Sequence, residues 1–113
     1  MQYQGSELLK ILKAISNEKR LKIIEMLMEG RQCNCEISEA LGLPLNLVSH
    51  HMRLLEKIGL VNGEREKTDA RWIYYSIISS RMEEIQKIIH DYFDIRHLNS
   101  RSPMCNRKKP SGL

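Results

Sequence analysis

The 113-residue sequence predicts a mainly α-helical domain that carries one two-stranded β-hairpin. Apolar residues recur at helical spacing through most of the first 60 positions and again after residue 80. Between these regions, residues 71–77 are rich in aromatic and β-branched side chains, which are typical of a strand. The chain length is near the mode for single domains, so one folded unit is expected.

Several classes of protein are disfavoured by what the sequence lacks. No apolar run approaches the roughly 20 residues that a membrane-spanning helix needs, and the first ten residues do not resemble a signal peptide. We therefore expect a cytoplasmic protein without a membrane partner. There is no phosphate-binding glycine loop, HExxH zinc motif or nucleophile elbow, so an enzyme is not expected.

Residues 6–16 and 17–29 predict two amphipathic helices. Ser16 or Asn17 can cap the second helix, because either side chain can accept a hydrogen bond from a first-turn N–H. Gly30 ends this second helix. The two helices carry more apolar residues than packing against one partner requires, so we expect them to contribute to both the core and an interface.

A short third helix is predicted to begin with a capping box, in which Cys33 is the N-cap and Glu36 is its acid. Three apolar residues should face inward from this helix: Ile37, Ala40 and Leu41. Gly42 makes a tight turn, and Pro44 lies at or beside the start of the next helix, where a missing N–H costs nothing. This arrangement predicts two helices joined by a turn.

The helix after Pro44 has two opposite faces. Its apolar stripe is predicted to consist of Leu47, Val48, Met52, Leu55 and Ile58. Its polar stripe contains no acid and consists of Asn46, Ser49, His50, Arg53 and Lys57. A helix-turn-helix with such a face is typical of proteins that read the DNA major groove. His51 lies on the apolar side, so we expect it to be a packed, hydrogen-bonded histidine rather than a DNA contact.

Each polar side chain of this stripe has a plausible partner on DNA. Asn46 can pair with adenine, Arg53 can make a bidentate contact to guanine or phosphate, and Ser49 and His50 can reach base edges or phosphates. The alternative is a solvated polar face on an ordinary helix. The spacing of the helix-turn-helix and the basic hairpin that follows favour DNA binding.

That hairpin is predicted from residues 60–61 and 71–77, with a polar loop around Lys67 to Ala70. Its basic residues, which we expect to contact flanking DNA, are Arg65, Lys67 and Arg71. A hairpin directly after a recognition helix makes a winged helix-turn-helix. Ser79 or Ser80 should then cap a last helix extending to Ile95.

Residues 1–98 are therefore expected to form one DNA-binding and dimerisation domain, and residues 99–113 a basic, disordered tail. The net charge is +4, and the whole excess comes from four tail residues: Arg101, Arg107, Lys108 and Lys109. The folded body has no global positive charge, so it must bind DNA through a local patch.

Three cysteines are an odd number, and the expected cytosolic location disfavours a disulfide framework. We expect reduced thiols that bind a metal or respond to oxidants. In a continuous helix, residues two apart point in nearly opposite directions. With Cys33 outside the helix and Cys35 in its first turn, both sulfurs can approach one ion. A helix N-terminus also favours thiolates, which select soft or borderline ions.

The chain resembles the ArsR/SmtB family of metal-responsive repressors over roughly residues 6–95. The residues that carry the resemblance around the recognition helix are Ala40-Leu41-Gly42-Leu43, Val48-Ser49, His51-Met52, Leu55 and Gly59-Leu60-Val61. Two further matches are the wing segment Arg71-Trp72-Ile73-Tyr74-Tyr75 and the helix start Asn17-Glu18-Lys19-Arg20-Leu21.

The resemblance implies a homodimeric repressor that occupies an inverted-repeat operator until an inducer binds. The first and last helices would form the dimer interface through Leu8, Leu9, Leu12, Ile85, Ile88, Ile89 and Tyr92. Cys33 and Cys35 occupy the position at which members of the family bind arsenite, antimonite, cadmium or lead. The implied inducer is therefore As(III), Sb(III) or a soft divalent ion of the Cd, Pb or Zn type.

The sequence departs from the arsenite-sensing pattern C-x-C-x-x-C, because Ser38 occupies the third thiol position. Cys105, from the same or the partner subunit, could supply the missing sulfur, or it could be an idle thiol. The last helix offers a second candidate site, since His90 and Asp94 are spaced i, i+4. Its alternative is a solvated helix face, and the full acidic and histidine set, His90, Asp91, Asp94 and His97, does not reproduce the zinc and nickel pattern.

Two other functions remain open. A repressor of the same fold could respond to oxidants or persulfides through its cysteines, without any metal. A winged-helix module could instead serve protein assembly and bind no DNA.

Overall fold

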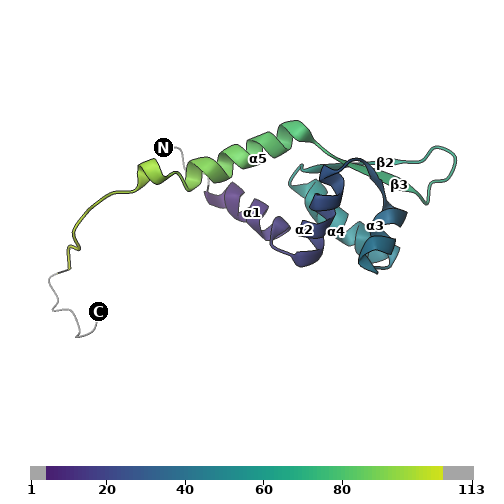
Figure 1. Ribbon diagram of the computed structural model, residues 1–113, viewed down its shortest axis with the longest axis horizontal. Helices are drawn as coiled ribbons and strands as arrows, with labels where there is room; N and C mark the ends of the chain where they lie inside the picture. Colours follow the sequence, from purple (N-terminus) through teal and green to yellow (C-terminus); the bar gives the residue numbers. More distant parts are fainter. Residues whose placement is uncertain (1–4, 106–113) are drawn as a thin grey trace.

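A computed structural model describes residues 5–105 (Figure 1). Residues 106–113, which belong to the predicted basic tail, lie outside the described residues. The elements, in chain order, are α1 (Gly5–Ile15), α2 (Glu18–Met28), β1 (Gln32–Cys33), α3 (Asn34–Leu41), α4 (Leu45–Lys57), β2 (Val61–Arg65), β3 (Ile73–Ile77), α5 (Ser79–Tyr92) and the 3-10 helix η1 (Ile95–His97). Within residues 5–105, every helix is too short or too polar to span a lipid bilayer.

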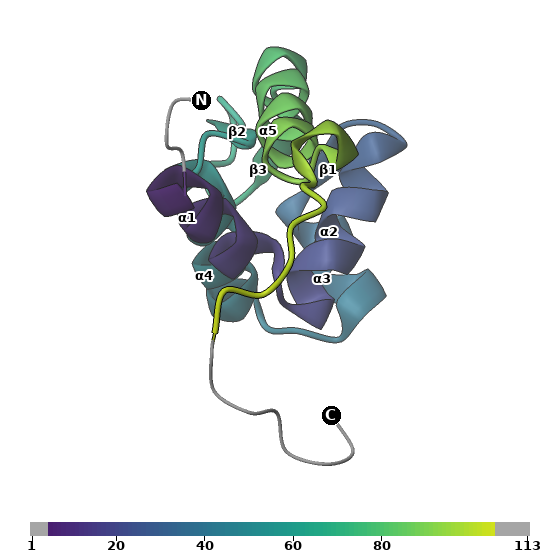
Figure 2. The ribbon, with the colours of Figure 1, turned by 90° about the vertical axis from the view of Figure 1, so that its left-hand side faces the viewer.

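The core lies among the first four helices and the inner side of the wing. Figure 2 shows α1 and α4 on one side of the molecule and α2 and α3 on the other, with α5 and the strands above them. The largest fully buried side chains are Ile11, Ile23, Ile37, Val48, Met52 and Leu55. Every helix from α1 to α4 contributes to this set, so the helix-turn-helix is held by direct packing of its neighbours.

The local signals at the ends of α2, α3 and α4 are confirmed. Asn17 caps α2 by accepting a hydrogen bond from the Arg20 N–H at 3.1 Å. The capping box at α3 is present, with the Glu36 carboxylate accepting from the Cys33 N–H at 2.8 Å. Gly42 adopts φ 64°, a left-handed conformation that ends α3 and starts the turn. Pro44 is the N-cap of α4.

The sheet has three strands, not the predicted two. β1 pairs antiparallel with β3, placing Gln32 opposite Tyr75 and Cys33 opposite Tyr74. β3 also pairs with β2, from Val61 opposite Ile77 to Arg65 opposite Ile73, and these two strands form the predicted wing. A strand of two residues has no period of its own, so alternation in the sequence could not reveal β1.

The predicted apolar stripes needed two corrections. Leu47 is 41% exposed, because it is turned about 100° around the helix from Val48, and the buried stripe of α4 is Val48, Met52 and Leu55. Ala40 is exposed rather than buried, since α3 has only eight residues and directs Ile37 and Asn34 inward.

The last helix also differs from its prediction. Ile78, not Ser79 or Ser80, is the N-cap, and it makes no side-chain capping bond. The helix ends at Tyr92 rather than Ile95, because Asp94 caps the separate turn η1 by accepting from the Arg96 N–H at 2.9 Å. α5 packs beside α1, where Arg81 forms an ion pair with Glu7 at 3.1 Å. Beyond η1, residues 99–105 are exposed and lead away from the body (Figure 1).

Candidate DNA-binding face and cysteine pair

The predicted DNA-reading residues of α4 lie on its outer side. Asn46, His50, Arg53 and Lys57 are exposed, and Ser49 is partly exposed. This exposure follows from the buried stripe on the other side of the same helix. The side chains are therefore available to a partner in solution.

His51 is directed inward, as predicted, and its partner is a residue that the sequence did not single out. Its Nδ1 lies 2.9 Å from a guanidinium nitrogen of Arg20, which is itself only 9% exposed. Arg20 also donates from Nε to the carbonyl of Ala14 at the end of α1. Burial lowers the pKa of His51, and the nearby Arg20 lowers it further. A neutral His51 can therefore accept the Arg20 hydrogen bond and connect α1, α2 and the recognition helix.

The recognition helix and the wing enclose a shallow cleft of about 280 Å³. Three predicted DNA contacts, Ser49, Arg53 and Arg65, line it together with Glu56, an acid that the sequence analysis did not consider. Tyr75 lies at its base, where burial and the Glu56 carboxylate raise the pKa of its hydroxyl. The cleft brings helix and wing residues to one surface.

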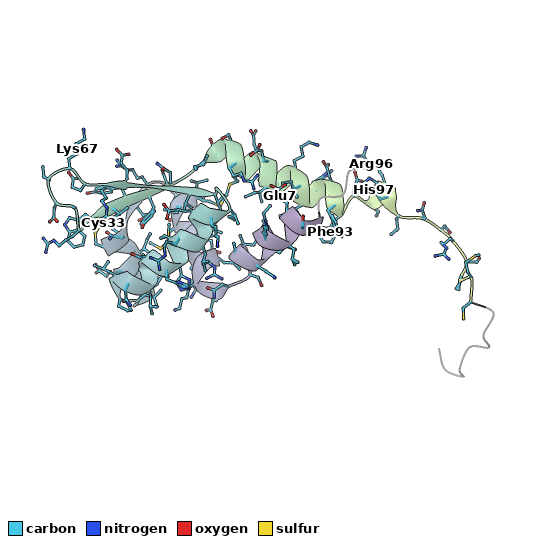
Figure 3. All side chains as sticks on the ribbon, turned by 180° about the vertical axis from the view of Figure 1, so that it is seen from behind. Glu7, Cys33, Lys67, Phe93, Arg96 and His97 are labelled. Atoms are coloured by element: carbon cyan, nitrogen blue, oxygen red, sulfur yellow. A yellow bond between two sulfur atoms is a disulfide. The ribbon has the colours of Figure 1, made fainter. Side chains whose placement is uncertain are left out.

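The wing cations differ in their freedom to contact DNA. Arg65 donates to the Ala70 carbonyl at 2.6 Å. Arg71 holds Asp69 through two side-chain hydrogen bonds of 3.0 and 2.7 Å, which lower the pKa of Asp69 to about 2. Lys67 lies at the tip of the hairpin, where Figure 3 shows its side chain directed away from the body.

Cys33 and Cys35 meet where the sheet passes into α3. Cys33 is the last residue of β1 and the N-cap of α3, and it is 4% exposed. Its Sγ accepts a hydrogen bond from the Cys35 N–H at 3.3 Å. Figure 3 shows Cys33 beneath the base of the wing, on the same side of the molecule as Lys67. The pair therefore lies close to the elements that would face DNA.

A disulfide joins Cys33 and Cys35, which corrects the expectation that both thiols are reduced. The extended conformation of Cys33 and the first helical turn at Cys35 leave their Cα atoms 5.2 Å apart, within the range of disulfides. The structure shows this pair of sulfurs in the joined form.

The predicted third sulfur is not part of this group within the chain. Cys105 is exposed in the segment that leads away from the body, whereas α3 lies at the other end (Figure 1). Among residues 5–105, no group of three or more His, Cys, Asp or Glu side chains is placed to hold a metal. Cys33 and Cys35 supply the sulfur donors that a soft ion prefers, but only two of the ligands it needs.

Asn34, between the cysteines, is a residue that sequence reasoning missed. It is 4% exposed, and its amide makes two hydrogen bonds to the backbone of the wing. Nδ2 donates to the Arg71 carbonyl at 3.1 Å, and Oδ1 accepts from the Ile73 N–H at 3.2 Å. An asparagine at a helix start is usually read as a cap, so the sequence carried no signal for this contact.

The candidate metal pair on the last helix is not assembled. Asp94 lies beyond the end of α5, where it binds the Arg96 side chain and backbone. His90 instead lies 3.5 Å from Asp91, whose carboxylate accepts a hydrogen bond from Lys87 at 2.8 Å. The hydrogen bond from Lys87 lowers the pKa of Asp91. Because the helix ends early, His90 and Asp94 do not share a helix face.

The predicted interface residues fall into three groups. Leu8 and Ile85 are buried within the single chain, while Leu12, Ile88 and Ile89 are partly buried. Leu9 and Tyr92 are 52% and 43% exposed. The apolar surface continues beyond Tyr92 through Phe93, Ile95 and Leu98, which are also exposed.

A helix-turn-helix followed directly by a β-hairpin, with polar and basic side chains on the second helix, defines the class of winged helix-turn-helix DNA-binding proteins. The chain belongs to the ArsR family of bacterial regulatory proteins, whose family model matches residues 17–63. This family consists of transcriptional regulators rather than enzymes.

Individual relatives agree with this assignment. An uncharacterized HTH-type transcriptional regulator of Methanocaldococcus jannaschii is 36% identical over 83 residues, which cover 73% of this chain and 90% of that protein. A homologue of the cadmium resistance transcriptional regulatory protein CadC from Staphylococcus aureus is 30% identical, with coverage of 67% and 61%. The solved structure of HlyU from Vibrio cholerae N16961 matches with a TM-score of 0.63 and 29% identity, and covers 82% of this chain and 98% of its own.

Proposed function

We propose that the protein is a homodimeric transcriptional repressor whose affinity for its operator is controlled at the Cys33–Cys35 pair. The observation that carries this proposal is the position of the pair. Cys33 is at once a strand residue paired with the wing and the N-cap of α3, the first helix of the helix-turn-helix. A chemical change at its sulfur therefore acts directly on both elements that flank the recognition helix.

In the operator-bound state, the two recognition helices of the dimer enter successive major grooves of an inverted repeat, about one helical turn apart. Asn46 and Arg53 read base edges, and Ser49, His50 and Lys57 contact bases or phosphates. Arg65, Lys67 and Arg71 contact the flanking backbone from the wing, and Asp69 orients the Arg71 guanidinium through a hydrogen bond of 2.7 Å. The exposure of the α4 side chains supports these roles.

The dimer forms through α1 and the end of α5. Its exposed apolar surface is supplied by Leu9, Tyr92 and Phe93, while the partly buried Leu12, Ile88 and Ile89 lie behind it. Leu8 and Ile85 act by packing the two helices against each other within one chain. Such a row of exposed apolar side chains is typical of a protein-binding surface.

The proposed inducer is a thiophilic metal or metalloid ion: As(III), Sb(III) or a soft divalent ion. Two thiols at a helix N-terminus suit such an ion, since the helix dipole favours thiolates and thiolates select soft metals. Cys33 and Cys35 would hold it, and Cys105 of either subunit is a candidate for a further sulfur ligand. The similarity to a cadmium resistance regulator supports this class of inducer.

Direct oxidation is a second candidate for the input, and the Cys33–Cys35 disulfide favours it. In this reaction the two thiols lose two protons and two electrons and form one S–S bond. A peroxide accepts them, so that one molecule of hydrogen peroxide yields two molecules of water. Both candidates join the two sulfurs, and they differ in whether an ion lies between them.

The test measures binding of the reduced protein to a fluorescent DNA fragment from upstream of its own gene. We expect affinity to fall as salt rises, and to fall by about 5–150-fold when arsenite, cadmium or peroxide is added. The double variant Cys33→Ser/Cys35→Ser should bind DNA but lose this response, while the control Cys105→Ser should reveal whether the third sulfur is needed.

Each result decides between the candidates. A response to arsenite or cadmium under reducing conditions supports an ion, and a response to peroxide without any metal supports the disulfide. If the double variant still releases DNA with the same reagents, the sensor lies elsewhere. If the wild type shows no salt-dependent DNA binding, the repressor function itself is wrong.

A further inference from the structure

We propose that Asn34 is a positioning residue that transmits the state of the Cys33–Cys35 pair to the wing. The inference rests on the proposed function of that pair and adds the path by which the signal travels. It is carried by the side-chain amide of Asn34, which is buried between the sulfurs and the backbone of the hairpin.

The side-chain amide of Asn34 bonds to the wing backbone just beyond the last paired residue of β1. β1 pairs residue 32 with 75 and residue 33 with 74, so residue 34 would be opposite Ile73 in the same register. The backbone of Asn34 instead turns into α3. Its side chain then supplies a carbonyl oxygen to the Ile73 N–H and an N–H to the Arg71 carbonyl, an acceptor and a donor of the kinds that a neighbouring strand offers.

This role requires asparagine specifically. Aspartate keeps the acceptor for Ile73 but has no N–H for the Arg71 carbonyl, and leucine has the same size but neither group. Because the site is buried, either loss leaves backbone groups of the wing without a partner. The side chain therefore connects the position between the cysteines to the start of β3, in addition to the pairing of β1 with β3.

The state of the sulfurs changes what the amide can bind. Cys33 Sγ lies 3.3 Å from Asn34 Oδ1, so a reduced thiol can donate to the oxygen that also accepts from Ile73. A sulfur bonded to Cys35 or to an ion has no hydrogen to donate. Joining the two sulfurs also closes a ring around Asn34, which restricts the backbone that carries this amide.

From Asn34 the connection continues to the charged end of the wing. The Arg71 carbonyl that Asn34 holds belongs to the residue whose side chain binds Asp69. The Asp69 carbonyl in turn accepts from the Trp72 N–H at 3.1 Å. A shift of the Arg71 backbone therefore moves the base of the loop that carries Lys67, and with it the cation at the tip.

The test compares Asn34→Leu with a matched control, Asn62→Leu, which replaces an exposed asparagine of β2 in the same hairpin. For each protein, DNA affinity is measured in the reduced form and after treatment with arsenite or, in a second arm, hydrogen peroxide. In Asn34→Leu, we expect the reduced and treated forms to differ in DNA affinity by no more than about twofold. The difference typical of coupled sites is about 5–150-fold. The control should keep the full effect.

The ratio of the two affinities separates positioning from mere stability. A purely structural role would weaken both states alike and leave the ratio unchanged, and a thiol titration checks that Asn34→Leu still reacts at both cysteines. If the reactive variant keeps the wild-type ratio, the inference is overturned. If the wild-type protein binds DNA equally well before and after treatment, the proposed function fails instead.

A second test uses the wild-type protein alone, without variants and without DNA. NMR amide spectra of the isotope-labelled protein are recorded in the reduced form and again after peroxide or arsenite has joined the two sulfurs. The signals of the Asn34 side-chain NH₂ and the Ile73 backbone N–H should shift between the two spectra. The Asn62 side chain should not shift. Unchanged Asn34 and Ile73 signals would overturn the inference whatever the DNA experiments show.

Discussion

At the residue scale, a few buried polar side chains connect the elements of the domain. Arg20 joins α1 to the recognition helix through Ala14 and His51, and Asn34 joins α3 to the wing. Both are almost fully buried, and neither has a fully buried polar side-chain atom without a partner. Pairing is what makes such burial tolerable, because an unpaired polar group inside a protein costs about 1–3 kcal/mol.

Burial of His51, and secondarily its contact with Arg20, predicts a dependence of stability on pH. The pKa of His51 is lowered from 6.5 in the folded protein. Below pH 6.5 the unfolded chain therefore binds more protons than the folded chain, and the free energy of unfolding falls as pH drops from 7 towards the lowered pKa. The slope from one proton is limited to about 1.4 kcal/mol per pH unit.

Chemical denaturation at pH 7 and pH 5 measures this effect. His51→Gln should reduce the loss of stability between the two pH values, and the exposed neighbour variant His50→Gln should leave it in place. An equal loss in the wild type and in His51→Gln would show that the pH dependence comes from other groups.

The sequence could predict His51 but not its partner. Helical spacing placed His51 between Val48 and Leu55 on the buried side of α4; the structure confirms its hydrogen bond and shows it partly buried. Arg20 lies in an amphipathic helix among charged neighbours, and its spacing gave no signal for burial. Its side chain is held between Ala14 of α1 and His51 of α4, tertiary contacts that local periodicity does not encode. The same holds for Asn34.

At the scale of elements, the wing is the part whose geometry depends most on close contacts. Gly63 of β2 pairs with Tyr75 of β3, and the Tyr75 ring lies over it. A Cβ at position 63 would be 2.7 Å from Cε1 of this ring, which is too close for any real contact. The Tyr75 side chain is buried and cannot move aside freely.

We therefore expect Gly63→Ala to destabilise the protein by about 1–3 kcal/mol, the usual cost of overpacking a well-packed site. Denaturant unfolding measures this change, and DNA affinity should fall with it because the Tyr75 ring lines the cleft between wing and α4. Gly30→Ala provides a contrast in which a new Cβ meets no atom within 4 Å, although its positive φ adds backbone strain. Wild-type stability in Gly63→Ala would mean that the ring and strand adjust.

The elements themselves were predictable to different degrees. Strong helical periodicity and the Gly42 turn predicted α1 to α4, and a cluster of aromatic residues predicted β3. The end of α5 was not predictable in this way, because apolar residues continue to Ile95 while Asp94 starts a new turn. A local capping bond decided that boundary against the apolar pattern.

At the scale of the whole molecule, the proposed dimer depends on apolar surface that a single chain leaves exposed along α1 and beyond α5. Leu9 is 52% exposed there. Leu21 of α2 is 48% exposed and is not among the residues named for the dimer, so it serves as a control and also tests whether α2 contributes to the interface. The two leucines differ in location far more than in exposure.

Leu9→Lys should weaken dimerisation by about 2 kcal/mol or more, which is about thirtyfold in the dissociation constant, because it places a charge in an apolar contact. Analytical ultracentrifugation measures this change. Leu21→Lys should leave the dimer intact. Equal behaviour of the two variants would place the interface elsewhere on the molecule.

The disulfide between Cys33 and Cys35 closes within one chain. In the proposed dimer, each subunit therefore holds its own complete pair of sulfurs, and the two subunits can react one at a time. A dimer that has reacted once is asymmetric, with one wing in each state, although the operator it faces is symmetric. Release from DNA would then follow inducer concentration through a half-occupied intermediate, and a binding curve with two resolvable steps would be its signature.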